Sequence, residues 1–214
     1  MTDRRRTRVK ICGLTRAEDV RLAADLGADA VGFVLWAGSP RGLSAGDAAR
    51  ISRGLPPYVA RVGVFVNPTV DEVDSARRQI GLSLIQLHGR VDVEAYRPLG
   101  VGVVLATSLV ADGELEAVAS WPDDVTPIVD AHDPERHGGT GRTADWGRAA
   151  VLSARRPIVL AGGLTAENVG RGIRAVRPAA VDVSSGVETS PGVKDPDRLR
   201  AFIAAVQKVQ EETR

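Results

Sequence analysis

Cys12 and Asp130 are the two residues in this sequence of 214 residues whose types and positions best suit acid–base chemistry. Each of them ends a short run of apolar residues. A thiolate can remove a proton, and a carboxyl group can donate one where its surroundings keep it protonated. Cys12 also has a purely structural interpretation, because a free cysteine packs like a small hydrophobe and is often buried. Both interpretations stay open until the two residues are placed in a fold.

Eight short apolar runs predict the strands that must position these residues. They cover residues 8–12, 30–35, 60–66, 82–87, 101–107, 126–130, 157–161 and 180–184. Each run is continuous rather than alternating, which is typical of parallel strands buried on both faces. Cys12 therefore ends the first expected strand, and Asp130 ends the sixth.

Helix-start signals lie between these runs. The spacing of Thr15 and Glu18 predicts a capping box, and Thr165 predicts a hydroxyl cap ahead of an acidic first turn. Further helices are expected over residues 44–53, 70–80, 91–99, 113–119, 145–153 and 196–210. Pro196 suits the first position of the last of them. Strands and helices thus alternate along the whole chain.

Eight strand-plus-helix units in a chain of this length favour a single-domain (β/α)8 TIM barrel of the α/β class, spanning residues 1–214. An open, doubly wound sheet is the alternative. No composition shift or polar linker divides the chain. Residues 1–7 contain Arg4, Arg5 and Arg6, and we expect this stretch to be a flexible basic N-terminus.

Composition narrows the possible partners. The formal net charge is +1 and 4% of the residues are aromatic, so neither charge nor stacking side chains indicate a nucleic-acid partner. No apolar stretch reaches the ~20 residues that span a bilayer, and the N-terminus lacks a signal-peptide core. A single cysteine excludes an intramolecular disulfide. We expect a cytoplasmic protein without a membrane partner, either a monomer or a homodimer.

Two glycine-containing segments follow the last two expected strands. TIM-barrel active sites lie at the carboxyl ends of the strands, where late loops and helix N-termini often bind phosphate. The spacing therefore predicts a phosphate site made by Gly162, Gly163, Ser184, Ser185 and Gly186. Each segment alone could be no more than a tight turn. Together they predict a phosphorylated small molecule as the substrate.

A series of motifs then resembles the phosphoribosylanthranilate isomerase family. The motifs lie at residues 10–14 (Lys-Ile-Cys-Gly-Leu), 32–34, 39–41, 86–89, 130–131, 138–141, 145–146, 160–164 and 181–188. They span nearly the whole chain in the expected order. The resemblance implies a TIM barrel and an isomerase of tryptophan biosynthesis. Its reaction is the Amadori rearrangement of N-(5'-phosphoribosyl)anthranilate to 1-(o-carboxyphenylamino)-1-deoxyribulose 5-phosphate, which needs no metal and no redox cofactor.

The resemblance also implies roles for individual residues. Cys12 would be the general base and Asp130 the general acid, while Arg41 would bind the anthranilate carboxylate and His88 would line the pocket. A base needs a lowered thiol pKa, and an acid needs a raised carboxyl pKa. Arg41 could instead be a solvated loop residue, and His88 a structural one. Asp182, inside the last strand, would need hydrogen-bond partners if it faces the barrel interior.

Other functions remain to be weighed. A histidine-pathway isomerase, or a barrel that serves both pathways, would perform the same rearrangement, but that enzyme has an aspartate where this chain has Cys12. A metal-dependent sugar-phosphate epimerase and a phosphate-binding barrel without turnover are the others. A metal site could be drawn from His132, Asp133, Glu135 and His137, although their spacing matches no usual ligand motif.

Overall fold

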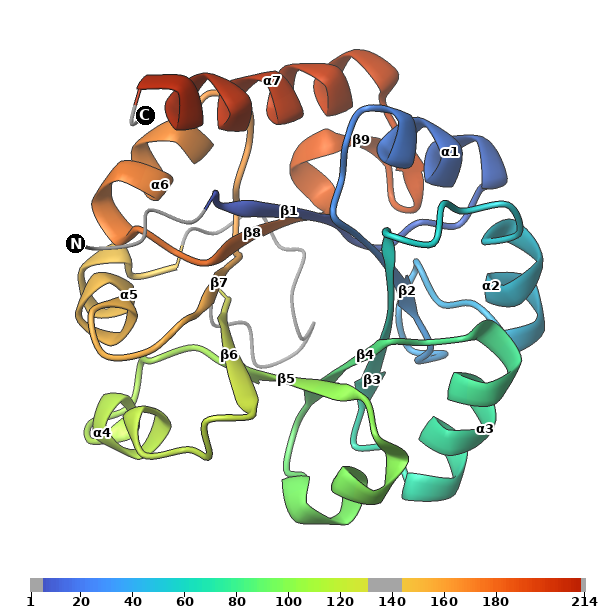
Figure 1. Ribbon diagram of the computed structural model, residues 1–214, viewed down its shortest axis with the longest axis horizontal. Helices are drawn as coiled ribbons and strands as arrows, with labels where there is room; N and C mark the ends of the chain where they lie inside the picture. Colours follow the sequence, from blue (N-terminus) through green and yellow to red (C-terminus); the bar gives the residue numbers. More distant parts are fainter. Residues whose placement is uncertain (1–5, 131–143, 213–214) are drawn as a thin grey trace.

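The computed structural model describes residues 6–130 and 144–212, and its strands form one closed parallel barrel in sequence order. The strands are β1 (Arg8–Ile11), β2 (Ala30–Val34), β3 (Ala60–Val66), β4 (Leu84–His88), β5 (Gly102–Thr107), β6 (Val125–Val129), β7 (Val159–Leu160) and β8 (Ala180–Val183). β1 pairs with β8, with Arg8 opposite Ala180 and Ile11 opposite Val183, and this pairing closes the ring (Figure 1). The predicted TIM barrel is confirmed, and the open-sheet alternative is wrong.

Helices surround the barrel, and each of them follows a strand. They are α1 (Ala17–Asp25), α2 (Ala45–Ile51), α3 (Val70–Ile80), η1 (Val93–Leu99), α4 (Glu114–Ala119), α5 (Trp146–Ser153), α6 (Val169–Val176) and α7 (Pro196–Glu212). The helix expected over residues 91–99 is a 3-10 helix, which contains Pro98. Proline has no N–H to donate, so a regular α-helix over this short stretch would lose a hydrogen bond.

The main apolar core lies between the strands and these helices. Phe33 on β2 and Leu160 on β7 are fully buried, and α7 presents Leu199, Phe202 and Val206 inward at helical spacing. Because helices cover the outer face of the sheet while the inner face is packed, both faces of each strand exclude water. This explains why the strands were recognisable as continuous apolar runs.

Both predicted hydroxyl caps are wrong. α1 begins after Arg16 without a side-chain cap, because the Thr15 hydroxyl donates instead to the Gly192 carbonyl at 2.6 Å. α6 begins only at Val169, after a turn in which the Asn168 side chain accepts from the Thr165 N–H at 2.9 Å. The Thr15 hydroxyl group makes a tertiary hydrogen bond instead of a cap, and the segment that begins at Thr165 forms a turn before the helix starts.

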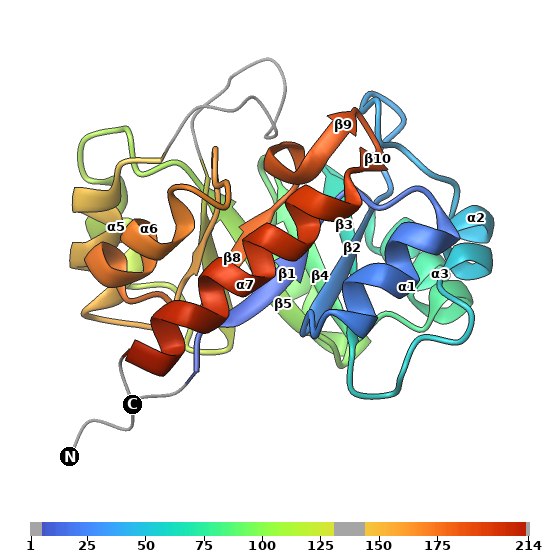
Figure 2. The same cartoon turned by 90° about the horizontal axis from the view of Figure 1, so that it is seen from above.

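A small hairpin follows the last barrel strand. After the 3-10 turn η2 (Ser185–Val187), β9 (Glu188–Ser190) pairs antiparallel with β10 (Val193–Lys194). Figure 2 shows the hairpin at one end of the barrel, beside the beginning of α7. Since Lys194 contacts the Cys12 carbonyl just past β1, this end is the carboxyl end of the strands. It is the end at which TIM barrels carry their active sites.

The expected flexible N-terminus is described only at Arg6 and Thr7. Arg6 forms an ion pair with Asp29, and the Thr7 hydroxyl donates to the Pro178 carbonyl at 3.3 Å. Both contacts are with segments that precede barrel strands. Arg4 and Arg5 lie outside the described residues.

Candidate active site

Cys12 immediately follows β1, and its backbone N–H donates to the Val183 carbonyl of β8 at 2.8 Å. The residue is buried. A Cβ built on Gly32 of the neighbouring strand would lie 2.9 Å from Cys12 Sγ and 3.1 Å from Lys10 Nζ. The thiol and the ammonium group therefore both lie against the same side of Gly32, and a larger residue there would displace them.

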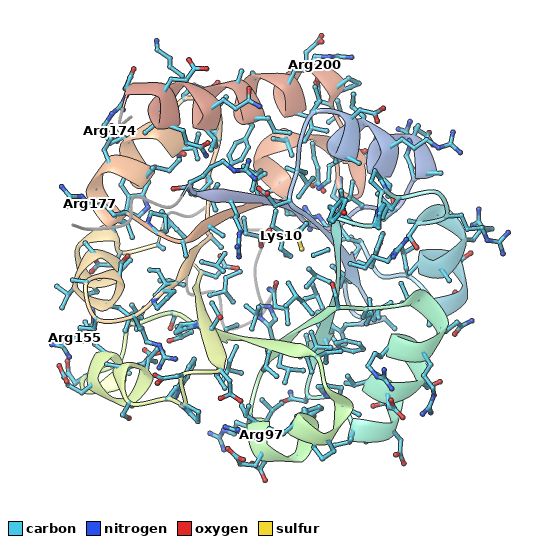
Figure 3. All side chains as sticks on the ribbon, in the orientation of Figure 1. Lys10, Arg97, Arg155, Arg174, Arg177 and Arg200 are labelled. Carbon is cyan, nitrogen blue, oxygen red and sulfur yellow. The ribbon has the colours of Figure 1, made fainter. Side chains whose placement is uncertain are left out.

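Lys10 points into the barrel, where its ammonium group donates to Asp182 Oδ1 at 3.0 Å. Figure 3 shows Lys10 inside the ring of strands, while the labelled arginines lie on the outer rim. Burial lowers the pKa of Lys10, but Asp182 and a Cys12 thiolate raise it by more, so the net pKa lies above its ordinary value. Lys10 is thus the buried partner that the Asp182 carboxylate needs inside the barrel.

The pKa of Cys12 is raised rather than lowered. Burial raises it most, and the nearby Asp182 carboxylate adds to that effect. The ammonium groups of Lys10 and Lys194 lower the pKa of the thiol, but not enough to compensate. The lowered pKa that a thiol base needs is therefore not found, because a buried thiolate loses its hydration.

Arg41 lies across Gly13, the residue after Cys12. A Cβ at Gly13 would lie 2.5 Å from Arg41 Cδ and 2.8 Å from Ser184 Oγ, and Gly13 has a left-handed φ of +69°. The guanidinium group donates from Nε and Nη2 to the two carboxylate oxygens of Glu188, at 2.9 and 2.6 Å. Arg41 is therefore a largely buried, oriented cation whose side chain is 11% exposed, and the solvated-loop alternative is wrong.

Lys194 completes this network from β10. Its ammonium group donates to the Cys12 carbonyl at 2.6 Å, the Glu188 carboxylate at 2.7 Å and the Ser184 carbonyl at 3.2 Å. The side chain is 0% exposed, and three acceptors match the three N–H donors of an ammonium group. We call these buried charges, Lys10, Arg41, Asp182, Glu188 and Lys194, the charged cluster.

The glycine loops, residues 162–164 and 184–186, lie beside the charged cluster. They line one pocket together with Asp130, Ala161, Asp182 and Val183. This pocket contains the predicted acid and all five residues predicted to bind phosphate. Gly162 and Gly163 have φ values of +79° and +60°, a left-handed backbone conformation that glycine adopts without steric cost. The two loops thus form one polar concavity at the carboxyl end of the barrel.

Close packing holds the glycine loops together. A Cβ at Gly186 would overlap the carbonyl oxygen of Leu164, so only glycine fits there. The hydroxyl group of Ser184 is buried and has no hydrogen-bond partner among the described residues. Buried polar groups normally have partners, and an oxygen of a bound anion would supply one.

Comparison with known proteins decides the family. The family model for N-(5'-phosphoribosyl)anthranilate isomerase matches residues 9–205. The chain belongs to the phosphoribosylanthranilate isomerase family. It is 46% identical to the N-(5'-phosphoribosyl)anthranilate isomerase of Chromohalobacter salexigens over 206 residues, which cover 96% of each chain.

Solved phosphoribosylanthranilate isomerases have the same fold. One, in complex with reduced 1-(o-carboxyphenylamino)-1-deoxyribulose 5-phosphate, is 38% identical with a TM-score of 0.83, covering 94% of this chain and 99% of its own. A monomeric form of the dimeric Thermotoga maritima enzyme gives 38% identity, a TM-score of 0.84 and the same coverage. The chain is therefore an isomerase.

His88 ends β4 and is buried, and its Nε2 lies 2.8 Å from Gln86 Nε2. It is not among the residues that line the pocket of the glycine loops. The candidate metal residues at 132–137 and the glycines at 138–141 lie outside the described residues. In the part of the chain that is described, no group of three His, Cys, Asp or Glu side chains is arranged to hold a metal ion.

Sequence reasoning assigned no role to Lys10, Glu188 or Lys194. Lys10 and Glu188 lie within motifs typical of the phosphoribosylanthranilate isomerase family, but Lys194 lies outside them. A lysine inside an apolar strand was the one available signal for Lys10, since lysine is almost never fully buried unless it is paired. No local pattern marked Lys194, because its contact with the Cys12 carbonyl joins segments that are distant in sequence.

Proposed function

We propose that this chain converts N-(5'-phosphoribosyl)anthranilate to 1-(o-carboxyphenylamino)-1-deoxyribulose 5-phosphate in tryptophan biosynthesis, with Asp130 as general acid and Cys12 as general base. The observation that carries the proposal is the meeting of Asp130 with both glycine loops in one pocket. Cys12 joins β8 at the same end of the barrel. Family membership supplies the reaction, and this arrangement supports the assignment of its residues.

The rearrangement needs one proton delivered and one removed. Asp130 gives a proton to the furanose ring oxygen as the C1–O bond breaks, and the nitrogen lone pair forms the C1=N bond of an iminium ion. The Cys12 thiolate then takes the proton from C2, and that electron pair forms the C1=C2 bond of an enolamine. Transfer of a proton from the C2 hydroxyl group to C1 gives the ketone. Proton exchange with solvent restores both groups.

The two ends of the substrate require different binding groups. The phosphate group would bind the backbone amides of Gly162, Gly163 and Gly186 and the hydroxyl groups of Ser184 and Ser185, as helix and loop N–H groups bind anions elsewhere. The anthranilate carboxylate would bind Arg41, because a guanidinium group offers paired N–H donors to a carboxylate. His88, at the end of β4, would line the substrate pocket without a proton-transfer role.

The remaining proposals concern the whole chain. None of the helices in residues 6–130 and 144–212 has the length and apolar character of a membrane span. We propose a cytoplasmic enzyme with a phosphorylated small-molecule substrate and no nucleic-acid or membrane partner. The Thermotoga maritima relative is described as dimeric, and we propose a monomer or homodimer here. Residues 1–214 would form one domain.

The direct test is to add purified protein to freshly generated phosphoribosylanthranilate and follow the loss of its fluorescence. The expected result is enzyme-dependent loss with formation of the ketose product. A parallel assay with the aminoimidazole substrate of the histidine pathway tests for a second activity. Absence of turnover on the anthranilate substrate would overturn the proposal.

A further inference from the structure

Glu188 is a buried carboxylate with two cationic partners and no role in proton transfer. Its side chain is 4% exposed, and it contacts Arg41 at 2.6 Å and Lys194 at 2.7 Å. Burial alone would raise the pKa of Glu188, but Arg41 and Lys194 lower it below its usual range, so the carboxylate stays ionised. Glu188 is therefore the negative charge that joins these two cations.

The contact with Glu188 uses only part of the guanidinium group of Arg41. Glu188 accepts from Nε and Nη2, which form one side of the planar fork. A guanidinium group has five N–H donors, and its far edge, Nη1 with the second Nη2 hydrogen, can receive another carboxylate. Among the described residues, Nη1 makes no hydrogen bond. One carboxylate thus fixes the plane of Arg41 and leaves a second bidentate edge for a ligand.

Lys194 helps to hold the Glu188 carboxylate in place, so that this carboxylate does not move when a ligand binds Arg41. Glu188 Oε1 accepts from the Lys194 ammonium group and from the Gly192 N–H, at 2.7 and 3.3 Å. The same ammonium group binds the Cys12 and Ser184 carbonyls. Because these bonds anchor Glu188 to the barrel, the orientation of Arg41 is set before a ligand arrives, and an oriented donor loses less entropy on binding.

We propose that Glu188, held by Lys194, is a positioning residue that orients Arg41 for the aromatic carboxylate of the substrate and so sets specificity for a carboxylated aniline. This inference rests on the proposed function, and it assigns Glu188 no contact with the substrate. Phosphate is the competing anion for Arg41, since the arginine stem lies beside Ser184 across Gly13. The test therefore distinguishes the two anions.

The experiment is a double-mutant cycle of Glu188→Gln and Arg41→Ala, read by steady-state kinetics on phosphoribosylanthranilate. Glu188→Gln should raise KM about 10-fold, the effect of losing orientation, and change kcat less than about 3-fold. Arg41→Ala should raise KM by about 10–100-fold, since hydrogen bonds to charged groups are lost. The double variant should match Arg41→Ala alone, because Glu188 acts only through Arg41.

Competitive inhibition by anthranilate and by inorganic phosphate shows which end of the substrate depends on Glu188. It also shows whether the substitution merely disturbs the structure. In Glu188→Gln, the inhibition constant of anthranilate should rise with KM, while that of inorganic phosphate should not change. Glu116→Gln is the matched control, because Glu116 pairs with Arg155 in an exposed ion pair; it should leave both constants unchanged. Glu188→Asp keeps the charge, shortens the side chain and should raise KM in the same direction if Glu188→Gln fails to fold.

Each other outcome has a definite meaning. Unchanged KM in a folded Glu188 variant, or an equal rise in the phosphate constant, would overturn the positioning role while leaving the proposed function intact. Additive effects in the double variant would do the same. If the wild-type protein shows no turnover, the proposed function fails and this inference fails with it.

Discussion

The charged cluster and the glycine loops lie at the same carboxyl end of the barrel, but they are prepared for anions by different means. In the charged cluster, buried lysine and arginine side chains are held by carboxylates and carbonyl oxygens. In the glycine loops, the polar groups are backbone amides and serine hydroxyls on chain that is fixed by close packing. The first region depends on side-chain pairing, and the second depends on the absence of side chains.

That difference suits the two ends of the proposed substrate. The phosphate group would meet backbone dipoles that cannot titrate, whereas the reacting carbon and the carboxylate would lie beside charges whose balance can change. Substitutions in the charged cluster should therefore change the pH dependence or the chemical step. Substitutions in the glycine loops should mainly change binding.

The largest expected effect is on the chemical step. Replacing Cys12 with Ala or Asp130 with Asn should lower kcat by about 10²–10⁴-fold, the usual contribution of a general acid or base. Turnover of phosphoribosylanthranilate under saturating substrate measures this, and unchanged circular dichroism serves as the folding control. A variant that keeps wild-type turnover would remove that residue from the mechanism.

The next effect should come from the glycine loops. Gly186→Ala places a methyl group against the Leu164 carbonyl, so the loops must separate and their amides lose their alignment. KM should rise by about 10–100-fold, the scale of lost hydrogen bonds to a charged group. Overpacking should lower the free energy of unfolding by about 1–3 kcal/mol. Kinetics and urea denaturation measure the two quantities.

Gly46→Ala is the control for that substitution. Gly46 lies in α2, and an added Cβ there would make only ordinary contacts, the nearest at 3.5 Å. It should leave KM unchanged and raise the free energy of unfolding by about 0.5–1 kcal/mol, as alanine in a helix does. Equal KM values for the two alanine variants would end the assignment of the glycine loops to phosphate binding.

A direct pH titration of the thiol tests the charged cluster. The ultraviolet absorbance of the Cys12 thiolate should appear only at a pH above the ordinary thiol value of ~8.5, because burial raises the pKa of Cys12. Lys10→Met removes an ammonium group that favours the thiolate, so the midpoint of this titration should move to still higher pH. Lys208→Met, on the exposed face of α7, should not move it. A midpoint below the ordinary thiol value would contradict the raised pKa.

The smallest effect is expected outside both regions. Thr69 and Glu72 form a capping box at the start of α3, and Thr69→Ala should lower the free energy of unfolding by about 1 kcal/mol. For a chain of this size that corresponds to a fall in Tm of about 2–4 °C. Turnover and KM should be unchanged. A change in either would show that the outer helices influence the site.

The fold was predictable because each barrel strand is encoded by a short, continuous stretch of the sequence. Buried parallel strands need continuous apolar runs, and β3 occupies the predicted residues 60–66. β7 covers only Val159–Leu160, which is shorter than the predicted run over residues 157–161. Cys12 and Asp130 could be found because each directly follows a recognisable strand.

The charged cluster was much less predictable. Lys194 binds the carbonyl of a residue 182 positions away, and nothing in the sequence near it indicates a buried ammonium group. Arg41 lies in a motif of the sequence, at residues 39–41. Its hydrogen bond to Glu188 was not predictable, because that bond forms only when the fold brings the loop after β2 to the hairpin after β8. The direction of the Cys12 pKa shift was also beyond reach, since it depends on how far burial exceeds the nearby charges.

The bond from Lys194 to the Cys12 carbonyl has a consequence for how the enzyme is made. Cys12 leaves the ribosome well before Lys194 and β8, the strand that closes the ring on β1. Contacts between such distant segments form late, because chain entropy opposes them until the ring can close. A nascent chain that lacks the hairpin after β8 has the thiol but not the charged cluster. We therefore expect acid–base activity only once the barrel is complete, and we expect chains that stop before the hairpin to be inactive.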